Sequence, residues 1–184
     1  GDELRGRRQD PGGGTLEGRE RARERELDRA RALEAAERAV VSFGQGCEGE
    51  PLLRGEDLVE TIERIRARTA RGTINLNTNG SRPGIVERMC GAGLNAIRVS
   101  INSARQVTYD RYYLPRGYAF DDVVETLRVC RRHGVHTSIN WLAFPGVSDR
   151  QAEVEAICEL ASEVGLDLIQ VRNLNIDPDL YLES

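Results

Sequence analysis

The sequence predicts an α/β fold in the form of a partial (β/α) TIM-like barrel, with parallel strands and the helices outside. Three observations predict it. Short apolar runs alternate with helical patterns and give five strands. Most of these strands have one apolar and one polar face, which suits a sheet covered by helices on one side only. Polar residues also gather where the strands end, at the edge where (β/α) barrels place their sites.

The first 38 residues are expected to form a flexible arm and a charged helix that precede the barrel, which would occupy residues 39–184 and be truncated at both ends. Gly1–Thr15 is rich in Arg, Asp and Gly and reads as a flexible arm. Glu20–Glu37 is helical by composition and carries a thin apolar stripe. Its many charges indicate a solvated face rather than a binding patch.

The stretch Ala39–Leu53 organises the rest of the chain. A β-branched strand, Ala39–Phe43, runs into a glycine-rich turn that delivers Glu50 and Pro51. Glycines in such a turn let backbone N–H groups approach a ligand closely. The alternative is a tight strand-to-helix turn with no ligand, because glycine-rich turns are weak motifs.

The later elements follow in order. Four further strands are expected at Thr73–Asn77, Ala96–Ile101, Val135–Leu142 and Leu166–Arg172. Helices are expected around Leu58–Ile65, from Pro83 to a Gly91-Ala92-Gly93 end, at Ser103–Tyr113, from Phe120 to Gly134, and from a Ser148/Gln151 capping box through Val154, Ile157, Ala161 and Val164 to Gly165.

The polar faces of the strands predict an open, wet cavity. In Ala96–Ile101, Arg98 and Ser100 lie opposite three apolar side chains, and Asn75, Asn140, Gln170 and Arg172 lie on the polar faces of other strands. A closed barrel is normally packed with Val, Ile and Leu, so an incomplete barrel that holds a ligand fits better. The alternative is that the polar face meets solvent.

Composition excludes several classes of function. A formal net charge of -4 gives no case for nucleic-acid binding, and no apolar run approaches the ~20 residues of a membrane span. The cysteines, Cys47, Cys90, Cys130 and Cys158, are too far apart for a metal site. Free thiols in a reducing, cytoplasmic location are the simplest interpretation, and the last three are expected to pack inside helices.

Taken together, these motifs resemble the radical S-adenosylmethionine (SAM) superfamily over about residues 39–172. Gly49-Glu50-Pro51 is similar to the family's Gly-Gly-Glu motif, with Glu48 in place of the first glycine. Thr78-Asn79-Gly80 is similar to its Thr-Asn-Gly, and Ser100 with Asn102 matches the end of the following strand. The order and spacing of the motifs make the match strong.

The resemblance implies a set of cofactor contacts and a reaction. Glu50 would hold the amino group of SAM, Ser100 and Asn102 its ribose or carboxylate, and the backbone near Val171 its adenine. The full cofactor-binding set would be Gly49, Glu50, Pro51, Thr78, Asn79, Ser100, Asn102, Asn140 and Val171. Reductive cleavage of SAM would give a 5′-deoxyadenosyl radical, and this radical would abstract a hydrogen atom from the substrate. Because such a reaction needs no side chain as an acid or base, no catalytic residue is assigned.

For the substrate and the partners, the resemblance implies only chemical classes. Asn75, Arg98, Gln170 and Arg172 are candidates for orienting a polar small molecule or peptide inside the barrel. The electron would come from a reductant such as a flavodoxin or ferredoxin.

One departure from the family concerns the [4Fe–4S] cluster that binds SAM. Its three ligands come from a CxxxCxxC loop, which this sequence lacks. We expect the chain alone to carry no cluster and to be inactive, and the parent reading frame to encode the loop upstream of Gly1. Cys47, in the motif turn, is a weak candidate for a hydrogen-atom donor.

Three other functions stay open. The first is a cluster-less SAM-binding or interaction protein without radical chemistry. The second is an ordinary barrel enzyme, such as an aldolase-like or phosphate-binding one. That class should show a catalytic lysine or paired carboxylates, but the sequence contains no lysine. The third, a helical interaction module, would explain only Glu20–Glu37.

Overall fold

The computed structural model describes residues 16–36, 38–44, 49–174 and 176. The arm at residues 1–15 and the centre of the glycine-rich turn, with Cys47, lie outside the described residues. None of the described helices is long and apolar enough to cross a membrane.

Five parallel strands form one sheet in sequential order, β1-β2-β3-β4-β5. They are β1 (Val40–Phe43), β2 (Thr73–Thr78), β3 (Ala96–Ile101), β4 (His136–Ala143) and β5 (Leu168–Asn173). Every pair of neighbours is parallel, because each strand is followed by a helical crossover that returns the chain to the same end of the sheet.

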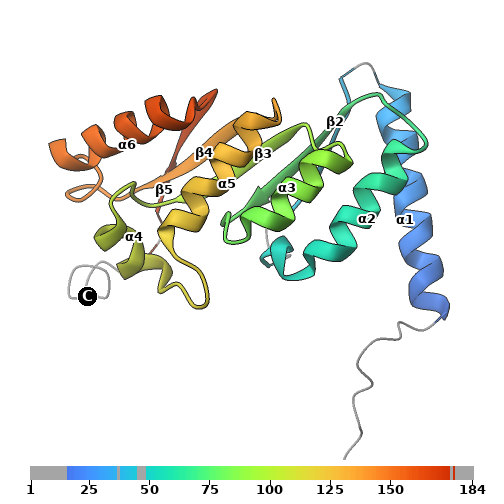
Figure 1. Ribbon diagram of the computed structural model, residues 1–184, viewed down its shortest axis with the longest axis horizontal. Coiled ribbons are helices and arrows are strands. Elements are labelled where there is room, and N and C mark those ends of the chain that lie inside the picture. Colours follow the sequence, from blue (N-terminus) through green and yellow to red (C-terminus); the bar gives the residue numbers. More distant parts are fainter. Residues whose placement is uncertain (1–15, 37, 45–48, 175, 177–184) are drawn as a thin grey trace, which may run out of the picture.

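The helices are α1 (Leu16–Ala35), the 3₁₀ helix η2 (Pro51–Arg54), α2 (Gly55–Arg66), α3 (Pro83–Ala92), α4 (Gln106–Tyr113), α5 (Phe120–Arg132) and α6 (Gln151–Val164). Figure 1 shows α2, α3, α5 and α6 side by side over one face of the sheet, with α1 beside α2. The predicted partial barrel, with helices on one side, is therefore confirmed.

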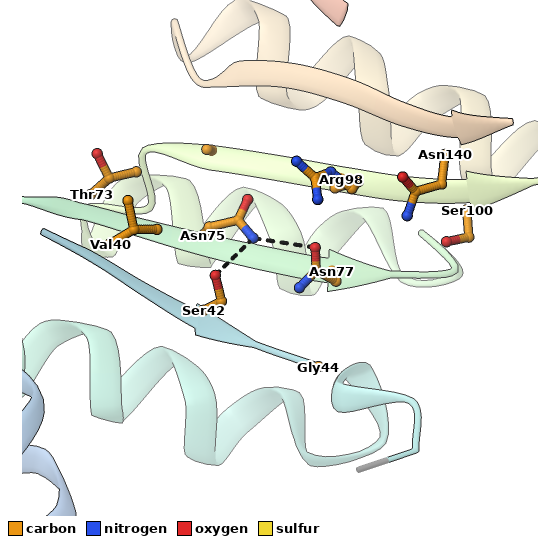
Figure 2. A pocket seen from close by; sticks show the side chains of 10 residues that line it. Val40, Ser42, Gly44, Thr73, Asn75, Asn77, Arg98, Ser100 and Asn140 are labelled. Carbon is orange, nitrogen blue, oxygen red and sulfur yellow. Dashed lines mark hydrogen bonds between the residues drawn. The ribbon is translucent and has the colours of Figure 1, made fainter. Parts of the chain in front are cut away.

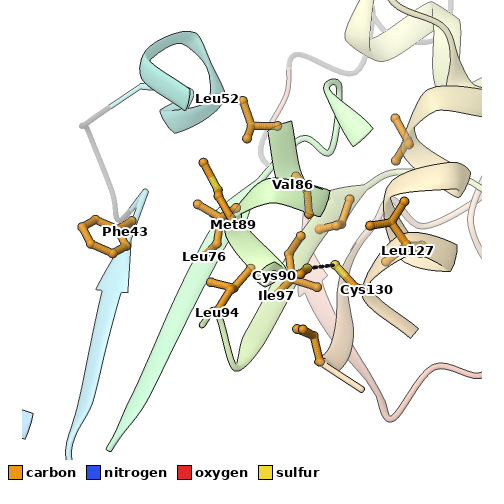
Figure 3. Packing of buried hydrophobic residues seen from close by; sticks show 14 of the residues in the cluster. Phe43, Leu52, Leu76, Val86, Met89, Cys90, Leu94, Ile97, Leu127 and Cys130 are labelled. Atoms are coloured by element: carbon orange, nitrogen blue, oxygen red, sulfur yellow. Dashed lines mark hydrogen bonds between the residues drawn. The ribbon is translucent and has the colours of Figure 1, made fainter. Parts of the chain in front are cut away.

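The hydrophobic core lies between the helices and the sheet. Six apolar residues of the three central strands are completely buried: Ile74, Leu76, Ile97, Val99, Ile101 and Ile139. Figure 3 shows strand residues packed against side chains from α3 and α5. In β1 to β4 the apolar face thus packs against the helices and the polar face is left open, whereas the apolar residues of β5 are exposed.

Two of the three helical cysteines behave as predicted. Cys90 and Cys130 are buried in this core with their sulfur atoms 3.9 Å apart (Figure 3). The expectation for Cys158 is wrong, because it lies on the exposed face of α6.

Strands β4 and β5 begin later than predicted, and both do so for the same physical reason. Val135 and Leu166 each follow a glycine in the left-handed conformation at a helix end. The Val135 amide donates to the Cys130 carbonyl, and the Leu166 amide donates to that of Ala161. These bonds close α5 and α6, so both residues belong to helix ends.

The predicted capping box of α6 is also wrong. The Ser148 hydroxyl accepts from the Phe144 amide (2.8 Å) and so closes the preceding turn, and Arg150 is the N-cap residue. Val154 is 40% exposed, and Glu153 occupies the buried position beside it.

Candidate functional site

The open face is the sheet face opposite the helices, and a cavity of about 590 Å³ lies on it. Its lining comes from β1 to β4 and from Gly44, just after β1: Val40, Ser42, Gly44, Thr73, Asn75, Asn77, Ala96, Arg98, Ser100 and Asn140 (Figure 2). The strand register places these side chains in rows, such as Asn77 beside Arg98 and Ser100 beside Asn140. Of the polar residues predicted to face the interior, Asn75, Arg98, Ser100 and Asn140 line this cavity, whereas Gln170 and Arg172 do not.

Glu50 joins the end of the β1 turn to the end of β2. One carboxylate oxygen accepts from the Leu52 amide (3.0 Å) and the Thr78 hydroxyl (2.5 Å), and the other accepts from the Asn79 amide (2.8 Å). A carboxylate offers about four acceptor positions, so most of its capacity is used within the chain. The geometry makes Glu50 first of all a residue that fixes two turns relative to each other.

Hydrogen bonds fix the conformation of the turn after β2. Thr78 is buried, and its hydroxyl oxygen accepts from the Gly80 amide (3.1 Å). The Asn79 side chain accepts from the Ser81 amide (3.0 Å), and Thr126 on α5 donates to the Gly80 carbonyl (2.6 Å). Thr78 and Asn79 thus form a rigid part of the rim, next to Glu50.

Aromatic side chains on α4 fix the position of the end of β3. Tyr113 donates its hydroxyl to the Ser100 carbonyl (2.7 Å) and stacks on Tyr109. Burial raises the pKa of the Tyr113 hydroxyl well above its usual range, so it stays a donor at any physiological pH. Ser100 lines the cavity, as predicted.

Asn102 does not line the cavity, although it was predicted to contact the cofactor. Its side chain is 2% exposed and donates to the Thr108 carbonyl (2.9 Å), which closes the turn before α4. Its own carbonyl accepts from the Trp141 indole (3.1 Å). In this structure Asn102 shapes the loop that follows Ser100.

Sequence reasoning missed Glu153, which supports the same loop from α6. Its carboxylate is 3% exposed and accepts from the hydroxyls of Ser103 and Thr108, the latter at 2.8 Å, and from Arg105 at 3.2 Å. The signal in the sequence is an acid at the head of the stripe Glu153, Ile157, Leu160 and Val164, all of which are buried.

The predicted site residues on β4 and β5 make fewer contacts with the rest of the rim. Asn140 and Gln170 are neighbours in register, and each has a buried side-chain oxygen without a hydrogen-bond partner among the described residues. Val171 and Arg172 are exposed on the edge strand, and neither lines the cavity.

The remaining motif residues lie at the start of η2. Gly49 has a φ of +75° and is exposed, and Pro51 occupies the first turn of η2, where its missing N–H costs nothing. With Glu50 they place a backbone turn at the rim of the sheet, as the sequence predicted.

Comparison with known protein families decides the family. The model of the radical SAM superfamily matches residues 7–161. The chain belongs to the radical SAM superfamily. No curated protein matches the chain at the level of sequence.

Solved structures of radical SAM proteins share the fold. Methylornithine synthase (PylB) superimposes with a TM-score of 0.63 at 16% identity, over 88% of this chain and 46% of that protein. SuiB from Streptococcus suis gives 0.59 at 15% identity, over 86% and 34%. The chain thus spans less than half the length of either protein.

A shorter neighbour is covered almost completely. A domain of the pyruvate-formate lyase-activating enzyme from Bacteroides vulgatus gives a TM-score of 0.55 at 13% identity, over 78% of this chain and 88% of that one. At these identities the likeness concerns the fold.

Proposed function

We propose that the intact protein is a radical SAM enzyme and that this chain supplies the part of the barrel that binds SAM. In the intact protein a reduced [4Fe–4S] cluster would supply the electron for cleaving SAM, and the resulting radical chemistry would remove a hydrogen atom from the substrate. The proposal rests above all on the junction of Glu50 with Thr78 and Asn79, beside the polar cavity.

The rim residues fit a polar nucleoside ligand. Gly49 and Pro51 leave backbone groups accessible at the turn, and Glu50 keeps one acceptor position for an ammonium group. Ser100 offers a hydroxyl, and the unpartnered side-chain oxygen of Asn140 is a ready acceptor for a ribose hydroxyl. SuiB, one of the structural neighbours, has been crystallised with SAM bound.

The chain's own residues do not fit the cluster. Among the described residues no three His, Cys, Asp or Glu side chains come together as a metal site, and the whole sequence contains no CxxxCxxC. We therefore assign this chain the tasks of binding SAM, orienting it and excluding water. Cluster ligation belongs to residues outside it, and a flavodoxin or ferredoxin would be the reductant.

We also propose a cytoplasmic location for the protein. A cluster-dependent enzyme with reduced cysteines suits a cytoplasmic location, and the described cysteines Cys90, Cys130 and Cys158 are free thiols.

An ordinary acid–base barrel enzyme is disfavoured. The described lining of the cavity contains no Asp or Glu, and the chain has no lysine. The carboxylate of Glu50 is occupied by three donors within the chain. The rim therefore lacks the groups that general acid–base or Schiff-base chemistry requires.

The test is calorimetric titration of the 184-residue chain with SAM. We expect weak but saturable binding, because the iron atom that would provide part of the attachment is missing. Replacing both Ser100 and Asn140 by alanine should weaken binding by roughly tenfold or more, since each lost hydrogen bond is worth about 0.5–1.5 kcal/mol.

The control variant is Arg128→Gln on the outer face of α5, which should bind SAM like the parent chain. Absence of SAM binding, or equal affinity in the double variant and the parent, would contradict the proposed site.

A further inference from the structure

Arg98 is unusual among the described arginines because it lies in the polar cavity and its Nε lacks a hydrogen-bond partner there. It projects from the central strand β3 onto the open face, between Asn77 and Ser138 in register, and it lines the cavity (Figure 2). It is the one charged residue in the described lining. Its Nε is buried and has no hydrogen-bond partner among the described residues.

The neighbouring side chains satisfy one another rather than Arg98. The Asn75 amide donates to the Ser42 hydroxyl and to the Asn77 side chain, each at 3.2 Å. Asn77 donates in turn to the Phe43 carbonyl (3.2 Å), and Ser138 donates to the Ile97 carbonyl (2.9 Å). This ladder stiffens the cavity wall and leaves the guanidinium facing the space.

Arginines elsewhere show what Arg98 lacks. On the helix layer Arg64, Arg88, Arg128, Arg131 and Arg132 each lie within 4.0 Å of a carboxylate. No carboxylate lies among the described lining of the cavity. Arg98 is partly buried, and leaving its buried Nε–H without an acceptor is unfavourable, so its place in the cavity points to an acceptor that arrives with a ligand.

We propose that Arg98 binds the carboxylate of the enzyme's substrate. The inference rests on the proposed function and names the substrate class: a small molecule or peptide end that carries a carboxylate. The Nε–H and Nη–H edge of a guanidinium matches the two oxygens of a carboxylate. Arg98 lies two residues before Ser100 along β3, or about 6–7 Å deeper than the rim proposed for SAM.

Nitrogen-15 NMR of the 184-residue chain tests this directly through the Nε–H resonance of Arg98, assigned by its absence in Arg98→Lys. The probes are acetate and, as the uncharged isostere, acetamide. We expect acetate to shift this resonance saturably and acetamide to leave it in place. Arg98→Gln should bind acetate at least tenfold more weakly than the parent chain, as followed by the backbone amide shifts of β2 and β3.

Arg128→Gln is the matched control, because it removes one positive charge from the opposite face and should not change acetate binding. An acetate response shared equally by exposed arginines, or unchanged in Arg98→Gln, would overturn the proposal.

The carboxylate of SAM is the competing source, and a second arm separates the two. Acetate is titrated again in the presence of saturating SAM. If Arg98 serves the substrate, acetate still binds. If SAM abolishes acetate binding, and decarboxylated SAM does not, Arg98 holds SAM and the substrate assignment is wrong. Failure of SAM to bind at all would instead count against the proposed function, because the acetate arm does not depend on SAM.

Discussion

Replacing Gly44 by alanine is expected to destabilise the chain by about 3 kcal/mol or more and to abolish SAM binding. Gly44 has a φ of +72°, which costs an L-residue about 1–2 kcal/mol. A Cβ there would also overlap the Asn77 carbonyl oxygen and lie 2.9 Å from Pro51 Cγ. Because the backbone of β2 is fixed in the sheet, it cannot move away from the added methyl group without breaking strand pairing. The turn that carries Glu50 would have to move instead.

Gly134→Ala provides the matched control for this effect. Gly134 has a similar φ of +68° but no atom within 4 Å of the added methyl group. It should therefore cost only the conformational strain, about 1–2 kcal/mol, and leave SAM affinity unchanged. Urea denaturation and SAM calorimetry on both variants measure the difference. Equal loss of stability in the two would mean that the Gly44 turn can relax away from β2.

Replacing Glu153 by alanine is expected to cost about 3 kcal/mol, because it leaves the buried Ser103 hydroxyl, the partly buried Thr108 hydroxyl and the Arg105 guanidinium without their shared acceptor. Ser103 and Thr108 lie in the segment that closes the loop after β3, so SAM affinity should fall as well. The carboxylate is almost completely buried, which prevents water from replacing it.

The comparison variant is Arg105→Met. Its side chain is 52% exposed, so its ion pair with Glu153 should be worth less than about 1 kcal/mol. Denaturation midpoints of the single and double variants separate the two contributions. If Glu153→Ala costs no more than Arg105→Met, the hydroxyl bonds contribute little and α6 does not support the loop.

The strands, their order and the shared rim could be predicted because they follow from local patterns. Alternation in Ala96–Ile101 places Arg98 and Ser100 on one face, and a single pattern of strand and helix makes the sheet parallel. Those rules depend only on neighbours along the chain, which the sequence displays.

What sequence reasoning missed depends on contacts between distant segments. Glu153 looks like an ordinary surface acid until α6 is placed against Ser103, fifty positions earlier. Asn102 looked like a ligand contact because its motif position says nothing of Thr108. The starts of β4 and β5 were misplaced because a helix-closing bond and a strand look alike in an apolar residue after glycine.

The central claim is that SAM lies on the rim of the open face, between the turns after β1, β2 and β3. Backbone amide shifts in an NMR titration of the 184-residue chain with SAM test it most directly. The account predicts that the largest shifts occur at Gly49–Leu52, Thr78–Ser81 and Ser100–Ser103, and that the outer faces of α3 and α5 do not respond. Shifts centred on those helices, or no saturable shift at any rim residue, would contradict it.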